Sequence, residues 1–524
     1  MKDNPRIRLP RNRRILTTYQ GLDNLSAYPV TPEEYVAKID YLSGTQVGVL
    51  QWCLGAVVAF FDSRVLESWG AREIDYDFEW GYTHWLQASN LQHLIRTGND
   101  PLRLAVERGH RLGMQVWGSH RMNDGHHTYP GGDGLQSRFY IDHPELRMPT
   151  IPSNQTSAVY DWRHPEVLEQ NLAFLTDVAE RYDVDGIDLD FSRGGMQFSS
   201  GDVKFRQEVV GGHIKNLRAM LDRVGGRKGR RIGLSVQFYC FDPMNPQTFD
   251  RTPWKGNIQS LYDGGADVRA WAKEGLIDIL VGQCRSASLY ELDMGDWVKA
   301  VAGTDCLLMA GPGKPSRKKL SGGGPTTAEE HRAIAHRLYE QGVDGIAFYD
   351  YMHHGPFDLT PFREVGEPDG LRTKTKTYLF QLDMPRRVGD LSAGGATELE
   401  VEVADDAAGA FQEGHRAAAR LRLNVTHVNA PDDVRCFWNG TELAVRREAG
   451  LKMPFHERRL YKNDTPQWHL EASLDAGLIR KGKNRVRVET VAKYPKLKAP
   501  CELCLLELRI AYDEEMGYGD VAGA

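Results

Sequence analysis

The sequence lacks long hydrophobic runs. No stretch of its 524 residues approaches the roughly 20 apolar residues that a membrane-spanning helix needs. The first residues, 1–5, also lack the apolar segment of a secretory signal. Both absences favour a cytoplasmic protein that meets no membrane. The protein would instead be secreted if a leader had been removed from it.

The sequence also has no strong excess of charge of either sign. A formal net charge of -6 gives no electrostatic basis for binding nucleic acid. Cysteine is sparse as well, with seven residues at irregular spacing and one C-x-x-C pair at Cys501 and Cys504. An odd, scattered set predicts reduced thiols, and a single pair argues against a zinc site. We therefore expect neither a metal nor another cofactor.

A third absence concerns glycine-rich loops. No such loop follows the first expected strand, which counts against a doubly wound nucleotide-binding sheet. The chain instead alternates strands and helices up to about residue 370. Eight strands are expected, at 14–19, 47–54, 113–120, 184–191, 231–240, 276–283, 305–310 and 343–350. Eight strand–helix units predict a (β/α)8 TIM barrel over 1–370.

Capping residues mark where several helices of this barrel begin. Thr31 with Glu34, and Thr326 with Glu329, have the spacing of a capping box. Pro165 opens another helix, since proline is favoured at the first helical position.

Two connections of the expected barrel are unusually long, at 55–98 and 121–164. Long loops in a compact barrel tend to build binding sites. Both are rich in aromatic residues, among them Phe60, Phe61, Trp69, Tyr140, Tyr160 and Trp162. Aromatic rings stack on sugars, and they also pack against one another. The loops are therefore expected to form a glycan cleft, a small hydrophobic core, or both.

The pattern changes after residue 370. Residues 371–395 are expected to be a connector, and the hydrophobic period beyond them is two, at 399–403, 419–425, 485–491 and 504–510. This alternation, with turns such as Asn439-Gly440, predicts an all-β sandwich of jelly-roll type over 396–515 and a tail at 516–524. Three roles stay open for the sandwich: binding carbohydrate, bracing the barrel, and forming an oligomer.

The most informative segment is the fourth expected strand, 184–191. Its alternation puts Asp188 and Asp190 on one face and apolar residues on the other. Two carboxylates on one buried face are costly unless they are paired or used. Active sites of TIM barrels lie at the C-terminal ends of the strands. We therefore expect Asp190 to touch substrate, and the deeper Asp188 to hold Asp190 or raise its pKa.

A second polar cluster follows the third strand, within residues 120–127. Its polar residues include Arg121, Asn123, Asp124, His126 and His127. Glycoside hydrolysis needs two carboxyl groups, so we expect Asp190 to be the nucleophile or base and Asp124 to be the acid. Arg121 would pair with the aspartates, and His126 would bind sugar or carry a proton. A metal site is the alternative, although two adjacent histidines lack the usual ligand spacing.

Other polar residues lie at or near the ends of expected strands. A sugar subsite would be lined by Arg121, Asn123, His126, Arg193, Gln237, Tyr239, Gln283, Tyr349 and Asp350. Further carboxylates near strand ends are Asp242, Glu291 and Asp293. The sequence therefore leaves open which residue is the second catalytic carboxyl.

The segment 185–191, D-G-I-D-L-D-F, resembles the fourth-strand motif of TIM-barrel glycoside hydrolases. One similar group is the chitinase-like family, with the pattern D-G-x-D-x-D-x-E, but Ser192 stands where that pattern has its glutamate. Phe191 and Arg193 resemble a second group, the mostly bacterial glycosyl-hydrolase-like barrels, with D-G-I-x-L-D-[FY]-x-R. The stretches 121–124 and 164–167 resemble that group too. The resemblance covers about 14–360 and implies a glycosidase.

Residues and resemblance together predict a glycoside hydrolase of carbohydrate metabolism. Its substrate would be an oligosaccharide or a glycoside, cleaved by carboxylate acid/base or nucleophilic catalysis. Two alternatives remain. Ser192 in place of a glutamate is consistent with a barrel that binds carbohydrate without catalysis. A metal-dependent isomerase or aldolase-type barrel would use Asp190, Asp124 and His126.

Overall fold

The structure is a computed structural model of the chain. It describes residues 7–26, 28–78, 81–128, 133–149, 159–193, 198–242, 254–255, 257–284, 290, 292–311, 326–352, 358–381, 390–391, 395–426, 428, 432–448, 467–492 and 501–513. The chain divides into two compact units, which we describe separately. The first comprises Met1–Arg285, Met294–Lys314 and Gly342–Gly366, and the second Ser286–Asp293, Pro315–Gln341 and Glu367–Ala524.

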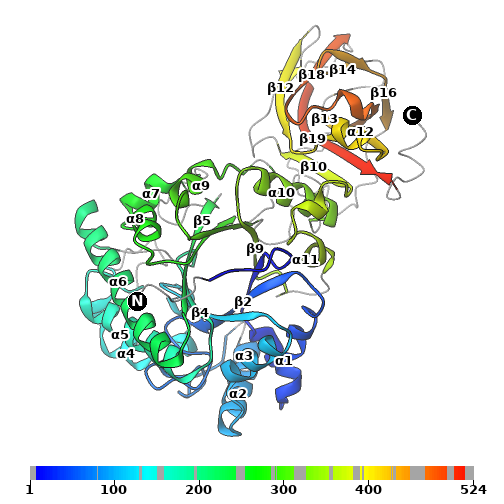
Figure 1. The fold of residues 1–524 in the computed structure, drawn as a ribbon. Coiled ribbons are helices and arrows are strands. Elements are labelled where there is room, and N and C mark those ends of the chain that lie inside the picture. Colours follow the sequence, from blue (N-terminus) through cyan, green and yellow to red (C-terminus); the bar gives the residue numbers. More distant parts are fainter. Residues whose placement is uncertain are drawn as a thin grey trace. The chain divides into compact units, whose positions relative to one another are not determined.

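The first unit is a closed barrel of eight parallel strands (Figure 1). They are β1 (Ile15–Tyr19), β2 (Val47–Gly55), β3 (Gln115–Arg121), β4 (Gly186–Asp190), β5 (Gly233–Asp242), β7 (Ile279–Cys284), β8 (Leu307–Gly311) and β9 (Gly345–Tyr349). The pairing of β1 with β9 closes the ring. The two-residue β6 (Trp254–Lys255) adds antiparallel to β5. All eight expected strands are confirmed.

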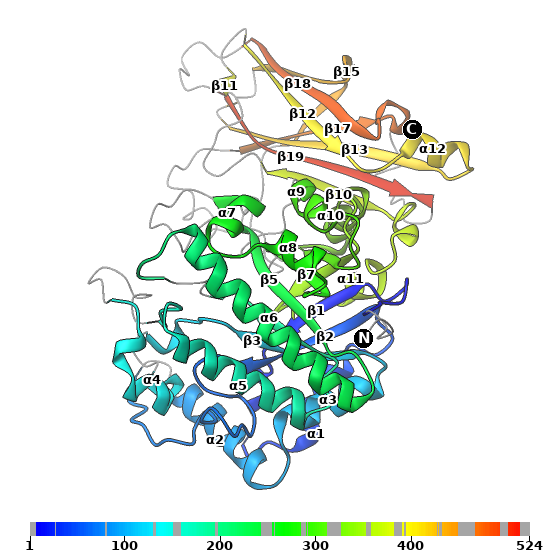
Figure 2. The same ribbon diagram turned by 60° about the vertical axis from the view of Figure 1, so that its left-hand side comes forward.

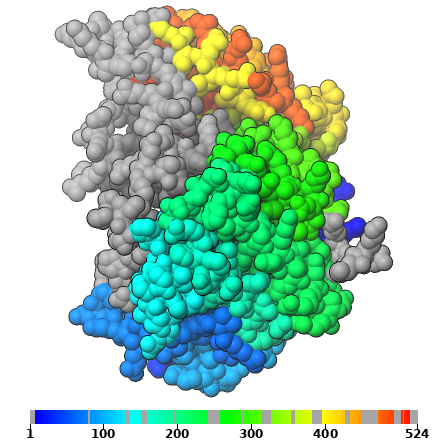
Figure 3. All heavy atoms as spheres, turned by 90° about the vertical axis from the view of Figure 1, so that its left-hand side faces the viewer, coloured from blue at the N-terminus to red at the C-terminus, as the bar shows by residue number. Residues whose placement is uncertain are grey.

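Helices surround the barrel, and Figure 2 shows α5 and α6 running beside its strands. They are α1 (Pro32–Asp40), α2 (Gly81–Arg96), α3 (Pro101–Arg111), α4 (Arg138–Asp142), α5 (Pro165–Arg181), α6 (Val203–Lys228), α7 (Ile258–Asp263), α8 (Val268–Lys273), α9 (Gly295–Val301) and α11 (Thr360–Glu364). In Figure 3 the cyan-to-green surface belongs to this helical shell. Apolar residues at helical spacing, such as Leu102, Ala105 and Val106 of α3, face inward and are buried.

The two expected capping boxes differ in outcome. Thr31 and Glu34 cap α1 reciprocally, as predicted. The second box is formed by Thr327 and Glu330 at the start of α10 (Ala328–Glu340), which belongs to the second unit. The prediction of Thr326 with Glu329 was wrong by one residue. The sequence has two adjacent threonines followed by two adjacent glutamates, so two capping boxes with the same spacing are compatible with it. The side chain of Glu329 instead binds Arg509 and Thr377.

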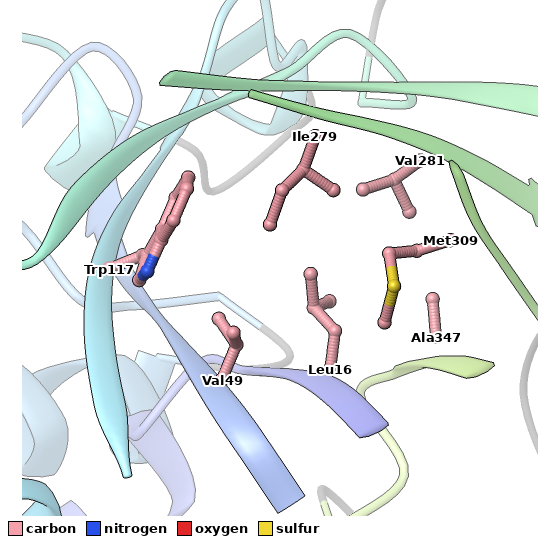
Figure 4. Packing of buried hydrophobic residues seen from close by; sticks show 7 residues of the cluster. All are labelled: Leu16, Val49, Trp117, Ile279, Val281, Met309 and Ala347. Atoms are coloured by element: carbon pink, nitrogen blue, oxygen red, sulfur yellow. The ribbon is translucent and has the colours of Figure 1, made fainter. Parts of the chain in front are cut away.

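One end of the barrel interior is filled by apolar side chains (Figure 4). The floor cluster consists of Leu16, Val49, Trp117, Ile279, Val281, Met309 and Ala347, all fully buried. Glycines make room for the largest of them. A Cβ at Gly186 or Gly233 would lie 2.3 Å from the Trp117 ring. Burial of each large side chain contributes about 1.5–3 kcal/mol, so this end stabilises the barrel.

The second unit contains two antiparallel sheets, which form the predicted sandwich (Figure 1). One sheet has β10 (Lys376–Gln381), β19 (Cys501–Tyr512), β13 (Ala417–Thr426), β17 (Gln467–Leu474) and β16 (Val445–Glu448), with β11 (Asp390–Leu391) on β19. The other has β12 (Ala396–Val403), β18 (Gly482–Ala492), β14 (Asp433–Trp438) and β15 (Thr441–Leu443). Helix α12 (Ala407–Gln412) lies between β12 and β13 in sequence. The stretch 371–395, expected as a connector, therefore contains two strands.

The described residues also bear on two further expectations, the lack of a membrane-spanning helix and the reduced cysteines. Within these ranges no helix combines the length and the apolar character needed to cross a bilayer. Cys53 and Cys436 are buried thiols outside any disulfide.

Candidate active site

Strand register places the two aspartates of β4 inside the barrel at different depths. Asp188 pairs with Ser119 of β3 and Ser235 of β5. Asp190, one step closer to the C-terminal end, pairs with Arg121 and Gln237. Both side chains are shielded from water, with exposures of 0% and 1%. The predicted facing of this strand is what the structure has.

Neutral donors surround Asp188. The hydroxyl of Ser119 donates to its Oδ2 at 2.7 Å and that of Ser235 to its Oδ1 at 2.5 Å. Gln51 adds a third hydrogen bond, and Thr18 Oγ1 donates to Gln51 Oε1 at 2.7 Å. Burial first, and the neighbouring Asp190 second, raise the pKa of Asp188 to about 7. Asp188 thus lies deeper than Asp190, with both carboxyl oxygens bound by neutral donors.

Asp190 is held by residues from two strand ends. The Tyr349 hydroxyl donates to Asp190 Oδ2 at 3.1 Å, and the backbone N–H of Ser192 donates to Oδ1 at 2.9 Å. The Ser192 hydroxyl also binds Oδ1. Burial raises the pKa of Asp190, against the opposing effects of Ser192 and of the cations Arg193 and Arg121. A raised pKa favours a carboxyl group that carries a proton.

A chain of amides continues from this aspartate across β5 and β7. Gln237 Nε2 donates to the Ser192 hydroxyl at 3.4 Å, and Gln283 Nε2 to Gln237 Oε1 at 3.5 Å. Both glutamines are fully buried. Tyr239 lies further along β5, is partly exposed, and acts electrostatically on Arg193. These predicted residues therefore lie around Asp190.

Asp124 has the opposite electrostatic setting. Arg121 Nη1 donates to its Oδ2 at 2.9 Å, and His126 binds its Oδ1 through both the ring Nδ1 and the backbone N–H. Burial would raise the pKa of Asp124, but Arg121, His126 and Arg193 outweigh it and hold the pKa far below the usual range. Asp124 is therefore ionised at neutral pH. The role of acid for Asp124 stays a prediction, and its partners stabilise the charged form of its carboxyl group.

The ring of His126 contacts two charged side chains. Nδ1 faces the carboxylate of Asp124, and Nε2 lies 3.4 Å from Arg193 Nη2, which can only donate. The ring therefore lies between the carboxylate of Asp124 and the guanidinium of Arg193. Its side chain is 48% exposed. His126 thus links the two charged side chains.

Asn123 has a structural role. Its side-chain Nδ2 donates to the Tyr160 carbonyl at 3.1 Å, and its Oδ1 accepts from the Tyr160 N–H at 3.2 Å. These bonds fasten the start of the 121–164 loop to its end. Asn123 was expected to bind sugar, but both ends of its amide are occupied by backbone.

Asp350 follows β9 with a φ of 55°, in the left-handed region. Gln20 donates to its Oδ2, and its own N–H donates to the Thr18 carbonyl at 3.0 Å. Its Oδ1 is buried and has no hydrogen-bond partner among the described residues. The same is true of Gln283 Oε1 and Arg121 Nη2. Of these three residues, Arg121 also lines a pocket.

A pocket of about 250 Å³ opens beside this cluster. Its apolar lining residues are Leu22, Ala56, Val57, Val58, Phe60, Trp69 and Leu135, and its polar ones are Gln20, His84, Gln87, Arg121, Asp124, His126, His127 and Arg193. A second, much smaller cavity of about 30 Å³ also reaches Arg121 and Asp124. The predicted loop residues therefore do build a concave surface over the strand ends.

The loop aromatics mostly form a core of their own. Tyr140 and Tyr160 pack with Val57, Leu146 and Val167 in one buried cluster. Phe60 and Trp69 pack against each other with ring centroids 5.7 Å apart, while also lining the pocket. Both expectations for these loops therefore apply, to different aromatic residues.

Several contributors were missed from the sequence. Thr18, Gln51 and Ser119 lie on inward positions of β1, β2 and β3 and complete the layer around Asp188. Each is a polar residue at a strand position otherwise filled by apolar ones, and that pattern would have identified them. Ser192, noted only as a departure from a motif, is a direct partner of Asp190.

Two further expectations concern a metal site and the other carboxylates near strand ends, Asp242, Glu291 and Asp293. Among the described residues, no group of three or more His, Cys, Asp or Glu side chains is arranged to hold a metal ion. Glu291 and the side chain of Asp242 lie outside the described parts of the structure. Asp293 belongs to the second unit.

No protein-family model and no curated protein sequence matches the chain. Among solved structures, it is similar to a cycloisomaltooligosaccharide glucanotransferase from Paenibacillus sp., with 10% identity and a TM-score of 0.36 over 95% of this chain and 57% of that one. It is also similar to a noncanonic maltogenic alpha-amylase from Thermotoga neapolitana, with 13% identity and a TM-score of 0.37 over 88% of this chain and 99% of that one. A third is the PgaB glycoside hydrolase domain from Bordetella bronchiseptica, with 14% identity and a TM-score of 0.37 over 67% and 98%. Likeness at this level carries no argument about activity, which has to come from the site itself.

Proposed function

We propose that the barrel hydrolyses glycosidic bonds, with Asp190 as the catalytic acid. One observation carries this proposal. Two carboxyl groups at neighbouring strand ends are linked to the same arginines, yet their surroundings move their pKa values in opposite directions. Such a pair is typical of sites in which one carboxyl carries a proton and the other is charged. The resemblance of the fourth strand to glycoside hydrolases supports the same conclusion.

The roles follow from the two protonation states. Protonated Asp190 would donate its proton to the glycosidic oxygen as the bond from that oxygen to the anomeric carbon breaks. The resulting Asp190 carboxylate would take a proton from the water that adds to the anomeric carbon. The fixed negative charge of Asp124 would stabilise the positive charge that develops on the sugar ring. Tyr349 and Ser192 would hold the Asp190 carboxyl in place.

The test replaces Asp190 by Asn and measures turnover on a panel of 4-nitrophenyl glycosides. The panel includes both anomers of neutral hexoses, N-acetylhexosamines and uronic acids. We expect the kcat of Asp190→Asn to fall by about 10²–10⁴-fold on any substrate that the wild type cleaves. The matched control is Asp183→Asn, because Asp183 is 72% exposed and precedes the same strand.

Two outcomes would contradict the proposal. Full activity of a folded Asp190→Asn variant would remove the role of that residue. Binding of glycans by the wild type without turnover on any member of the panel would favour the carbohydrate-binding barrel. Ser192 in place of a glutamate is consistent with that alternative.

A further inference from the structure

The guanidinium of Arg121 is a buried cation of the barrel that uses only part of its hydrogen-bonding capacity. The residue is 7% exposed. Its Nη1 is bound to Asp124, but its Nη2 is buried without a hydrogen-bond partner among the described residues. A buried N–H that finds no acceptor is costly, and it is worse for a cation. Arg121 also lines the large pocket, so an acceptor on a bound molecule would satisfy it.

The charges that line the pocket give the sign of that molecule. Arg121 and Arg193 are positive and Asp124 is negative, and three histidines, His84, His126 and His127, complete the titratable lining. Among the described lining residues, the arginines therefore exceed the carboxylates by one. Asp350 is not among the lining residues, and its Oδ2 is bound by Gln20.

We infer that the site takes a sugar bearing one carboxylate, so that the substrate is a glycoside of a uronic acid. This inference rests on the proposed function and narrows it. A single carboxylate matches the single excess charge, whereas a phosphate monoester carries close to two negative charges near neutral pH. Two carboxylate oxygens can also meet two guanidinium groups in charge-assisted hydrogen bonds, with Arg121 Nη2 as one donor and Arg193 as the other.

The second arginine is suited to this role. Arg193 is partly exposed, and its contact with His126 Nε2 is long at 3.4 Å. An incoming carboxylate would be a stronger acceptor for Arg193 than an imidazole nitrogen. The lining also includes Val57, Phe60 and Trp69, which offer an apolar surface for the C–H face of the ring. The pocket thus combines charged and apolar groups, as a sugar acid does.

The experiment compares matched 4-nitrophenyl glycosides that differ only at C6: glucuronide against glucoside and galacturonide against galactoside, in both anomers. We expect kcat/KM for the better uronide to exceed that of its neutral match by about 100-fold. Arg193→Gln should reduce this ratio to below about 10 while leaving turnover of the neutral glycoside measurable. Arg121→Lys, which keeps the charge beside Asp124, should also reduce the ratio because a lysine cannot supply both donors.

The possible results separate this inference from the proposed function. Cleavage of neutral glycosides with no preference for uronides would overturn the inference and leave the hydrolase intact. Preference for a glucoside 6-sulfate over the glucuronide would overturn the carboxylate in favour of a sulfate ester. If nothing is cleaved, calorimetry with glucuronate and glucose decides: selective glucuronate binding supports the inference although hydrolysis fails, and equal or absent binding overturns it.

Discussion

The polar centre of the barrel and that of the second unit both contain aspartates that are shielded from water. In the second unit, Asp405 is 0% exposed and lies 2.8 Å from the Nζ of Lys376, which is equally buried. The Tyr378 hydroxyl donates to its other oxygen, and His336 is a further neighbour. Burial raises the pKa of Asp405, but Lys376 and His336 outweigh it and the net pKa is lowered.

In the barrel, Asp188 is just as deeply buried but has neutral partners. Its donors are two serine hydroxyls and the amide of Gln51, and its pKa is raised to about 7. The difference teaches that burial alone does not decide the charge of a carboxyl group. A cation in contact lowers the pKa of the carboxyl group and keeps it ionised, whereas neutral donors leave it able to hold a proton near neutral pH. The same contrast recurs within the barrel between Asp124 and Asp190.

The largest effect that would break this comparison is expected from Lys376→Met. It leaves the charge of Asp405 buried without its main partner, and we expect a loss of about 3–5 kcal/mol in the unfolding free energy of the second unit. Urea unfolding followed by tryptophan fluorescence measures it. The double variant Lys376→Met with Asp405→Leu should recover most of the loss. A single variant as stable as the wild type would show that the pair is not a stabilising unit.

The second prediction concerns pH, and the two aspartates should act with opposite sign. Folding raises the pKa of Asp188 from 3.8 to about 7, so its contribution is complete below pH 4 and is lost as the pH rises through 7. The change is on the order of 4 kcal/mol. Folding lowers the pKa of Asp405, so its contribution is present above pH 4 and is lost as the pH falls further.

Variants separate these two contributions. Asp188→Asn should flatten the fall in stability of the barrel between pH 5 and 8, as measured by thermal unfolding across that range. Asp405→Asn should instead reduce the loss of stability in acid. An unchanged pH profile in Asp188→Asn would mean that Asp188 is ionised throughout.

A smaller effect is expected from Ser119→Ala. It removes one neutral donor from Asp188, which should cost about 1 kcal/mol and raise the pKa of Asp188 further. The loss should therefore be greater at pH 8 than at pH 5, and chemical denaturation at the two values measures it. An equal loss at both would indicate that the bond is the same to either form of the carboxyl.

The smallest effect is expected from Tyr349→Phe. Removing the hydroxyl that donates to Asp190 destabilises the charged form of that carboxyl and moves its pKa upward. Because the proposed acid must carry its proton, the alkaline limb of the kcat profile should move to higher pH. A shift to lower pH would contradict the assignment of Asp190 as the acid.

Much of the fold could be predicted because its signals are local. The alternation of polar and apolar residues at 184–191, and the strand–helix rhythm around it, predict a barrel strand with both aspartates facing inward, and β4 has this arrangement. The capping box that begins at Thr31 is confirmed. The box at the start of α10 begins at Thr327 and not at the predicted Thr326, because Glu329 binds the distant Arg509 and two threonine–glutamate pairs there have the same spacing in sequence.

The sequence by itself determined that two carboxyl groups would lie at different depths inside a barrel, since a period of two depends only on neighbouring residues. Only the tertiary structure decided which carboxyl group of the site holds a proton. Whether Asp124 or Asp190 holds a proton depends on partners such as Arg121, Tyr349 and Ser192, which strand register brings together from separate parts of the chain. A pKa is set by charges and donors within a few ångströms, and sequence separation says little about which groups those are.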